Sequence, residues 1–212
     1  MSQGGTVGPW GAVIKSLFDT PAEIRKAKKS ALLREGEFFR GEIIKGLRDQ
    51  APGGKHFKPL SERTIAIRRL LGFKGTKALM RHGDLRNSIS VHSAHDANDY
   101  VFVGVLRTAK NSKGEAMVDV ARLNEEGSKP IIIKMTPKMA ALLHAAFDKA
   151  GLHRMGPPRP STGVVVVQIP PRPFMGPVFE QHGGEEASKR FAEQVKKNMQ
   201  GKGVWAHVRG RL

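Results

Sequence analysis

Histidines and carboxylates that could bind a metal gather at one place in this sequence. His92 and His95 are three residues apart, and Asp96 and Asp99 follow closely. The local pattern is typical of a strand that ends in a turn, where a spacing of three points the two imidazoles to opposite faces. A metal site needs ligands that converge on one point. We therefore interpret this cluster as a surface turn, and we predict no metal site.

Motifs of the common enzyme classes are missing from the sequence. It contains no G-x-S-x-G, P-loop, H-E-x-x-H or G-x-G-x-x-G pattern. Glu125 and Glu126 form a carboxylate pair, but adjacent side chains do not converge on one substrate. We expect them on a solvated turn or at a contact between subunits. The sequence thus predicts no catalysis and no cofactor, and an enzyme of unrecognised reaction, such as a lysis or processing factor, is the least favoured alternative.

The charge of the chain predicts an acidic partner. Lys and Arg number 36 against 19 Asp and Glu, which gives a net charge of +17. Nucleic acid, an anionic membrane and an acidic protein surface all fit such a charge. The basic residues are spread over several helices and loops, and aromatic residues make up only 6% of the chain, so stacking on single-stranded nucleic acid is not indicated. A free nucleic-acid-binding protein remains an alternative reading.

The composition excludes several other classes of protein. There is no cysteine, which excludes disulfides, thiolate metal sites and a cysteine nucleophile. The first residues lack a basic leader followed by an apolar block, so we expect no signal peptide. No apolar run approaches the roughly 20 residues that cross a bilayer. We expect a soluble protein that is made in the cytoplasm.

Hydrophobic periodicity predicts the elements that must position any functional residue. We expect helices over residues 20–50, 61–71, 136–150 and 185–199, strands from residue 88, over 99–106, 129–135 (short and buried) and 164–169, a turn at 95–98, and a strand or short helix over 117–127. The predicted fold class is α+β, a mostly antiparallel sheet packed with a long N-terminal helix, a middle helix and a C-terminal helix. We expect one domain over residues 19–200, flanked by flexible arms at 1–18 and 201–212.

An unusual segment follows the run of valines at 164–167. The chain continues with Ile169, Pro170, Pro171, Arg172, Pro173, Phe174 and Met175. Proline cannot continue a strand ladder and fixes its own φ, so the chain must leave the sheet in one direction. We predict that Phe174 is a buried anchor, and that Arg172 points outward to an acidic neighbour.

The order of several motifs resembles the virion morphogenesis family of tailed bacteriophages, the tail-completion and neck proteins of Mu-like phages. These motifs are Pro52-Gly53 with Pro59-Leu60 and Thr64, then Gly83, Leu85, Ser88 and Ile89 of "GDLRNSI", then Val103-Gly104, Ala121 to Gly127, and Ile169 to Gly176 of "IPPRPFMG". The resemblance covers about residues 20–200. The family usually carries Tyr-Ala where this chain has Val120-Ala121. Residues 129–163 look like an insertion.

The resemblance implies a structural virion protein that is made in the host cytoplasm and located at the neck of the virion, where it forms a ring that joins head to tail. The implied partners are further copies of the chain, head-side portal or connector proteins, tail terminator or tail tube proteins, and genomic double-stranded DNA in the channel. It implies structural and assembly roles for Pro170, Pro171, Arg172, Pro173 and Phe174. The same roles fall to Gly83, Leu85, Ser88 and Ile89.

Overall fold

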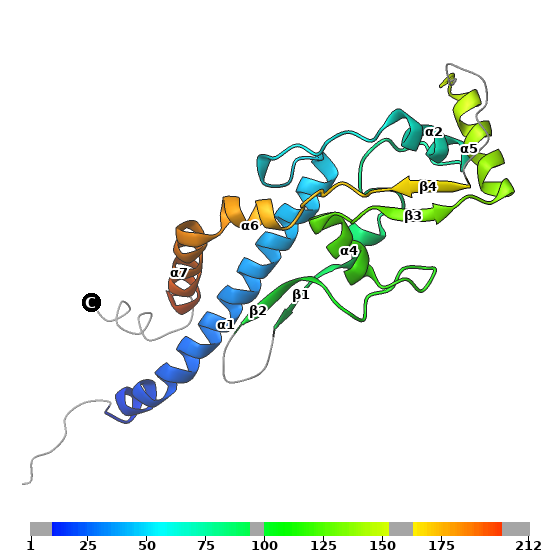
Figure 1. Cartoon of the computed structure of the whole chain (residues 1–212). Coiled ribbons are helices and arrows are strands. Elements are labelled where there is room, and N and C mark those ends of the chain that lie inside the picture. Colours follow the sequence, from blue (N-terminus) through cyan, green and yellow to red (C-terminus); the bar gives the residue numbers. More distant parts are fainter. Residues whose placement is uncertain (1–9, 94–99, 153–162, 201–212) are drawn as a thin grey trace, which may run out of the picture. The chain divides into compact units, whose positions relative to one another are not determined.

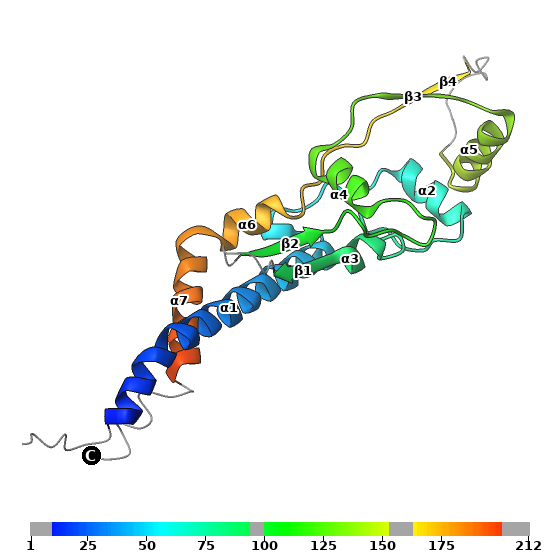
Figure 2. The ribbon, with the colours of Figure 1, turned by 90° about the horizontal axis from the view of Figure 1, so that it is seen from below.

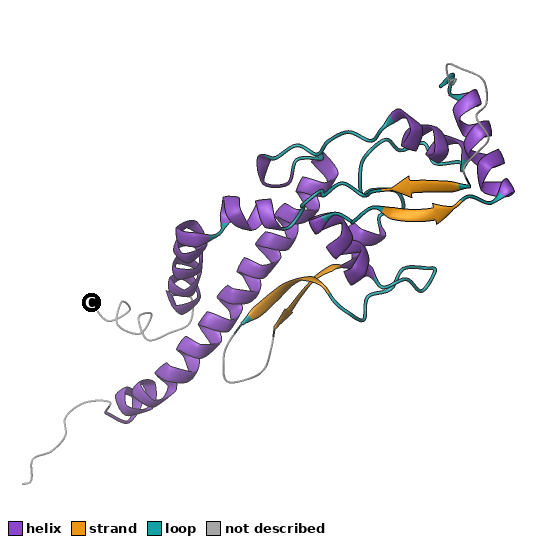
Figure 3. Ribbon diagram, in the orientation of Figure 1, coloured by secondary structure: helices purple, strands orange, loops and turns teal. Residues whose placement is uncertain are grey.

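The computed structural model describes residues 10–93, 100–152 and 163–200, and within these ranges the chain is α+β (Figure 1). The elements are α1 (Trp10–Asp49), the 3-10 helix η1 (Pro52–Gly54), α2 (Glu62–Leu70), α3 (Asp84–Ser88), β1 (Ile89–Ser93), β2 (Val101–Val105), α4 (Met117–Glu126), β3 (Ile131–Lys134), α5 (Pro137–Lys149), β4 (Val164–Val167), α6 (Gly176–His182) and α7 (Gly184–Gln200). Helix is the main secondary structure, as Figure 3 shows. The predicted fold class is confirmed. None of the helices in the described ranges is both long and apolar enough to cross a membrane.

Contacts divide the chain into two compact units. The first contains residues up to 38, residues 91–102 and residues from 183 onward, and the second contains residues 39–90 and 103–182. The border cuts through helix α1 and through strands β1 and β2. Boundaries between domains usually fall in exposed linkers, so a single domain over residues 19–200 stays a prediction.

Helix α1 begins earlier than the sequence suggested. It starts at Trp10 and contains Pro21, so residues 10–18 are helical and do not belong to an arm. The sequence predicts a start at Asp19-Thr20-Pro21, because capping residues and proline favour the first turn of a helix. A proline inside a helix removes only one donor and can be tolerated as a kink. The predicted arms at residues 1–9 and 201–212 lie outside the described residues.

The strands form two separate two-stranded sheets in the described part of the chain, both antiparallel. β1 pairs with β2, as predicted, and the predicted turn at 95–98 lies outside the described residues. β3 pairs with β4 in a register that places Ile132 opposite Val166. The expectation that the strand over 129–135 is buried is wrong, because Ile132 is 71% exposed.

The core of the second unit is built by helix α1 and the segments that follow it. Ile43 and Leu47 from α1 are fully buried, as are Ile89, Phe174 and Val178 from later in the chain. Three of these residues lie in the motifs that carry the family resemblance or directly beside them.

Helices α2 and α5 also belong to the second unit and lie side by side (Figure 2). Both start at the predicted residues, because a hydroxyl caps each. The Ser61 side chain accepts a hydrogen bond from the Thr64 N–H at 3.3 Å, and Thr136 does the same for Met139 at 3.3 Å.

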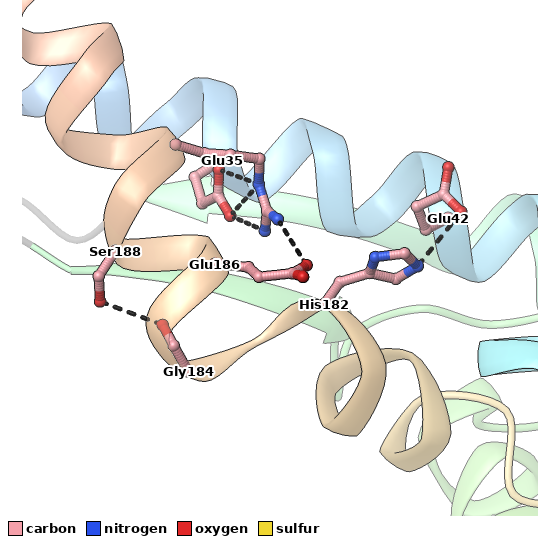
Figure 4. Close-up of polar contacts among 7 residues, drawn as sticks. Glu35, Glu42, His182, Gly184, Glu186 and Ser188 are labelled. Atoms are coloured by element: carbon pink, nitrogen blue, oxygen red, sulfur yellow. Dashed lines mark hydrogen bonds and ion pairs between the residues drawn. The ribbon is translucent and has the colours of Figure 1, made fainter.

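In the first unit, Arg190 of helix α7 contacts the part of α1 that belongs to the same unit. The Nη2 of Arg190 lies 2.5 Å from Oε1 of Glu35, and its guanidinium lies 4.2 Å from the ring centre of Phe38. Glu186 lies on the same helix and approaches Arg190 at 3.9 Å (Figure 4). The predicted helix over 185–199 is confirmed, whereas the short helix α6 was missed.

Candidate assembly site around the proline-rich segment

The proline-rich segment, residues 169–176, runs along the C-terminal end of helix α4. The backbone N–H of Ser128 donates to the carbonyl of Ile169 at 2.9 Å, and the N–H of Ile169 donates back to the Ser128 hydroxyl at 2.9 Å. The N–H of Arg172 donates to the carbonyl of Asn124 at 2.6 Å. Residues far apart in sequence are thus joined by hydrogen bonds, although the prolines supply no donors.

Glu125 holds the end of this segment in place. Its carboxylate accepts hydrogen bonds from the backbone N–H groups of Phe174 at 2.8 Å, Met175 at 3.3 Å and Gly176 at 2.8 Å. These donors lie at the start of α6, where helical N–H groups have no partner within the helix and favour a negative charge. The expectation of a solvated turn is therefore wrong for Glu125, while Glu126 is exposed. A contact of this pair with another subunit stays a prediction.

Burial separates the residues of the segment into two groups. Phe174 is 0% exposed, which confirms it as the buried anchor, whereas Pro170, Pro171 and Pro173 are exposed. Pro171 also lies against Gly127, which has φ of 82° and where a Cβ would stand 3.0 Å from the proline Cδ. Glycine is required there for both its conformation and its size.

The sequence predicts that Arg172 points outward, but in the structure it is only partly exposed. The residue is partly buried, and its Nε is a buried nitrogen for which the described residues supply no hydrogen-bond partner. The pKa of Arg68 is lowered by burial first, then by the guanidiniums of Arg81 and Arg172. Arg68 donates to the carbonyl of Lys77 at 2.8 Å, and Arg81 lies 4.1 Å from the ring centre of Phe73. Three guanidinium groups therefore share one region of the second unit.

The Gly83 motif has a role inside the fold. Gly83 has φ of 84° and precedes α3, and Leu85 and Ile89 are 4% and 1% exposed. The hydroxyl of Ser88 donates to the carbonyl of Leu85 at 2.8 Å, and Arg40 Nε donates to the carbonyl of Ile89 at 2.9 Å. Because Leu85 and Ile89 are buried, they can influence an assembly contact only through the fold.

Pro52 and Gly53 meet the residue that follows the proline-rich segment. Gly53 has φ of 56°, and a Cβ there would lie 2.2 Å from the carbonyl oxygen of Pro177. Pro52 and Pro177 are both buried. Helix α3 contacts helix α4, and η1 contacts α6. Four of the resembling motifs are thus linked in one structure, which we call the motif kernel, consisting of residues 52–53, 83–89, 121–127 and 169–176. No local pattern in the sequence predicts that Pro177 contacts Gly53.

A cavity of about 280 Å³ lies beside Gly83 and Leu85, and several of its polar lining residues make local contacts. Asn111 donates to the Glu115 carboxylate at 2.6 Å and accepts from the Lys113 backbone at 2.9 Å, and His82 contacts the ring of Phe73 edge to face. These residues hold a loop together, and they include no nucleophile paired with a base.

A histidine–carboxylate pair occurs elsewhere in the second unit, where His182 Nε2 lies 3.6 Å from Glu42 Oε2 (Figure 4). Within the described ranges, no group of three or more histidine, cysteine or acidic side chains is placed to hold a metal ion. In the cluster of histidines and carboxylates at residues 92–99, His92 is exposed. His95, Asp96 and Asp99 lie outside the described ranges. No family model, no curated protein and no solved structure matches this chain.

Proposed function

We propose that this protein is a structural component of the neck of a tailed-phage virion, where copies form a ring that joins head to tail. The motif kernel carries the proposal. Its four segments come from distant parts of the chain, and they include "GDLRNSI" and "IPPRPFMG", the segments on which the family resemblance depends. Short motifs that match a family by chance have no reason to meet in space. That these segments contact one another supports the resemblance, although each motif alone is short.

The contacts of the kernel also fit a protein whose task is mechanical. The hydrogen bonds of Glu125, the burial of Phe174 and the fixed φ of the prolines restrict the path between α4 and α6. A structural role requires a stiff connection of this kind, because forces between head and tail pass through the subunit.

Exposed apolar residues in the second unit support contacts with neighbouring subunits. Leu123 and Phe179 are 39% and 40% exposed, and Ile132 and Val166 are more exposed still. The net charge of +17 supports acidic neighbours, among them the portal or connector side, the tail terminator or tube, and DNA in the channel.

The proposal is tested in the phage that encodes the chain. A stop codon early in the gene should leave filled heads and free tails that do not join, as seen by electron microscopy, and supply of the protein in trans should restore joined particles. Mass spectrometry of purified virions should find the chain in multiple copies. Virions that carry tails but lack this protein would overturn the proposal.

A nucleic-acid-binding protein is the second candidate, and the shared region of Arg68, Arg81 and Arg172 favours it. Each phosphate contact made by such residues releases counterions, so binding must weaken steeply with salt. A filter-binding assay with double-stranded DNA over a range of salt concentrations separates the two. Tight, salt-sensitive binding by a chain that is absent from virions would favour this second candidate.

A further inference from the structure

The β3–β4 ribbon, residues 131–134 paired with 164–167, exposes apolar side chains on both of its faces. Ile132 and Val166 are direct cross-strand neighbours and are 71% and 63% exposed. On the opposite face, Ile131 and its partner Val167 are 44% and 37% exposed. Lys134 is the one charged residue in the two strands. No other exposed patch of the described chain combines so many large apolar side chains in one element.

Both edges of the ribbon also carry backbone groups that point away from the pairing. The N–H of Met135 donates to the carbonyl of Gly163 at 2.6 Å, so these residues form a hydrogen-bonded pair that extends the register. Hydrogen-bonded and non-hydrogen-bonded pairs alternate along antiparallel strands. The backbone groups of Ile132 and Lys134 therefore face outward on the β3 edge, and those of Val164 and Val166 face outward on the β4 edge.

A ribbon of this kind is incomplete by itself. Two strands alone are at best marginally stable in water, because they bury too little apolar surface. An edge with open N–H and C=O groups and apolar side chains pairs readily with another strand, and proteins usually protect it with charges, prolines or bulges. Lys134, at one end of β3, is the one charged residue that could discourage such pairing, and neither β3 nor β4 contains a proline. We take the edges to be sites of pairing.

A second copy of the same chain is the occupant that fits best. The rest of the chain is strongly basic, so two copies repel one another except where they present a nearly uncharged surface. The ribbon is such a surface, and a second copy necessarily brings an equally open and equally apolar edge. An acidic partner would find only Lys134 to contact on the ribbon, and one positive charge is too weak an attraction to bring it to this surface.

We propose that the β3 edge of one copy pairs with the β4 edge of the next, so that the ribbons of neighbouring copies form one continuous sheet. This arrangement uses both edges of every copy, whereas pairing of two β3 edges would leave both β4 edges open. A contact between different edges is head-to-tail, and such contacts close into a ring when the rotation allows it. The inference deepens the proposed function and depends on it for the ring, since it identifies the contact between ring subunits.

The contact should be weak between two copies and stronger in a closed assembly. Each strand has only four residues, so one contact between edges buries far less surface than a standard interface, which buries about 800 Å² per partner. Closing a ring makes the last contact intramolecular and raises the stability of the whole. The full-length protein should therefore shift from small to large species over a narrow range of concentration.

Sedimentation velocity on the full-length chain at several concentrations tests the contact. Ile132→Lys and Val166→Lys place a charge in the apolar row and should abolish the larger species. Leu71→Lys is the matched control, because Leu71 is an exposed apolar residue in the turn after α2, in the same unit, and gains the same charge. Circular dichroism and thermal melting show whether each variant is folded. A parent that stays monomeric, or folded ribbon variants that assemble like the parent, would overturn the inference.

Disulfide cross-linking tests which edges meet, and it is clean because the chain has no cysteine of its own. Ile132→Cys and Val166→Cys proteins should each give little cross-linked product alone, and an equal mixture of the two should give a disulfide-linked dimer under mild oxidation. Dimers formed by Ile132→Cys alone would show β3-to-β3 pairing and overturn the head-to-tail arrangement. Efficient cross-linking also supports the contact if a lysine variant fails to fold.

Failure of this inference and failure of the proposed function give different results. If the chain assembles through the ribbon but is absent from virions, the ribbon contact is supported and the proposed role in the neck is overturned. If the Ile132→Lys variant still assembles and still joins heads to tails, the proposed role in the neck is supported and the ribbon contact is overturned.

Discussion

Glu125 Oε2 lies 2.8 Å from the backbone nitrogen of Phe174, which is 49 residues later in the chain. The same carboxylate accepts from Met175 and Gly176, so one side chain holds three consecutive N–H groups. The adjacent Glu126 is exposed and has no such contact with the segment. Neighbouring residues of identical type therefore have different tasks.

Glu125→Ala should lower the free energy of unfolding by at least about 1.5–3 kcal/mol, the contribution of one hydrogen bond to a charged group. Glu126→Ala is the matched control and should change it by less than about 0.5 kcal/mol, as surface substitutions usually do. Urea denaturation followed by circular dichroism measures both. Equal effects of the two variants would contradict the role given to Glu125.

Phe174→Ala should lower the free energy of unfolding by about 3–5 kcal/mol, through lost burial and the cavity that remains. The side chain is fully buried, and the prolines on its N-terminal side restrict repacking. Phe179→Ala provides a comparison, since Phe179 is 40% exposed and stacks on Phe39. It should cost less. A thermal melt of Phe174→Ala that matches the parent would show that the anchor is elsewhere.

Gly53→Ala should destabilise the protein more than Gly54→Ala. Both glycines have positive φ, which costs a residue with a Cβ about 1–2 kcal/mol. At Gly53 the Cβ would also collide with the Pro177 carbonyl, which adds about 1–3 kcal/mol, while at Gly54 the nearest 4 Å are open. Chemical denaturation of the two variants side by side measures the difference. Identical midpoints would place the clash in doubt.

Arg172→Met should leave the free energy of unfolding unchanged or raise it, because it removes a buried nitrogen without a hydrogen-bond partner. It also removes a positive charge from beside Arg68, whose pKa is lowered by burial and by Arg81 and Arg172. A base with a lower pKa in the folded state destabilises the fold at every pH below that pKa, which includes neutral pH.

The same variant should reduce the joining of heads to tails, since we expect the guanidinium to meet an acidic neighbour in the particle. Arg69→Met is the control, because Arg69 is exposed and lies on α2. Complementation of a phage that lacks the gene gives the count of joined particles. A destabilised Arg172→Met protein would show that the residue serves the fold instead.

The sequence predicted the elements well where the signal is local. Ser61 and Thr136 marked the starts of α2 and α5, because a capping hydroxyl acts within three residues of itself. The paired strands β1 and β2 followed from their alternation. The start of α1 was missed, since Pro21 resembles a first-turn proline and only the wider context shows that the helix precedes it.

The contacts of the candidate site were less predictable, because they join residues about 50 positions apart. One signal was available at Glu125. It lies in the last turn of α4, where the helix dipole disfavours a carboxylate, and such a residue usually has donors from another part of the chain. The exposure of the β3–β4 ribbon could not be predicted, since a run of apolar residues indicates a need for burial and does not say which molecule supplies it.

The distance along the chain between the parts of the kernel has a consequence for biosynthesis. Glu125 and Gly53 are made well before Phe174 and Pro177, and closing a loop of this length costs entropy before any contact is gained. A nascent chain therefore carries an unsatisfied carboxylate and an open core until the last fifth of the sequence has left the ribosome. β4, at residues 164–167, is made shortly before that last fifth, so the β3–β4 ribbon also cannot form until late in synthesis. Truncated chains should fail to close the kernel, and premature termination would then yield products for degradation instead of defective subunits that enter an assembly.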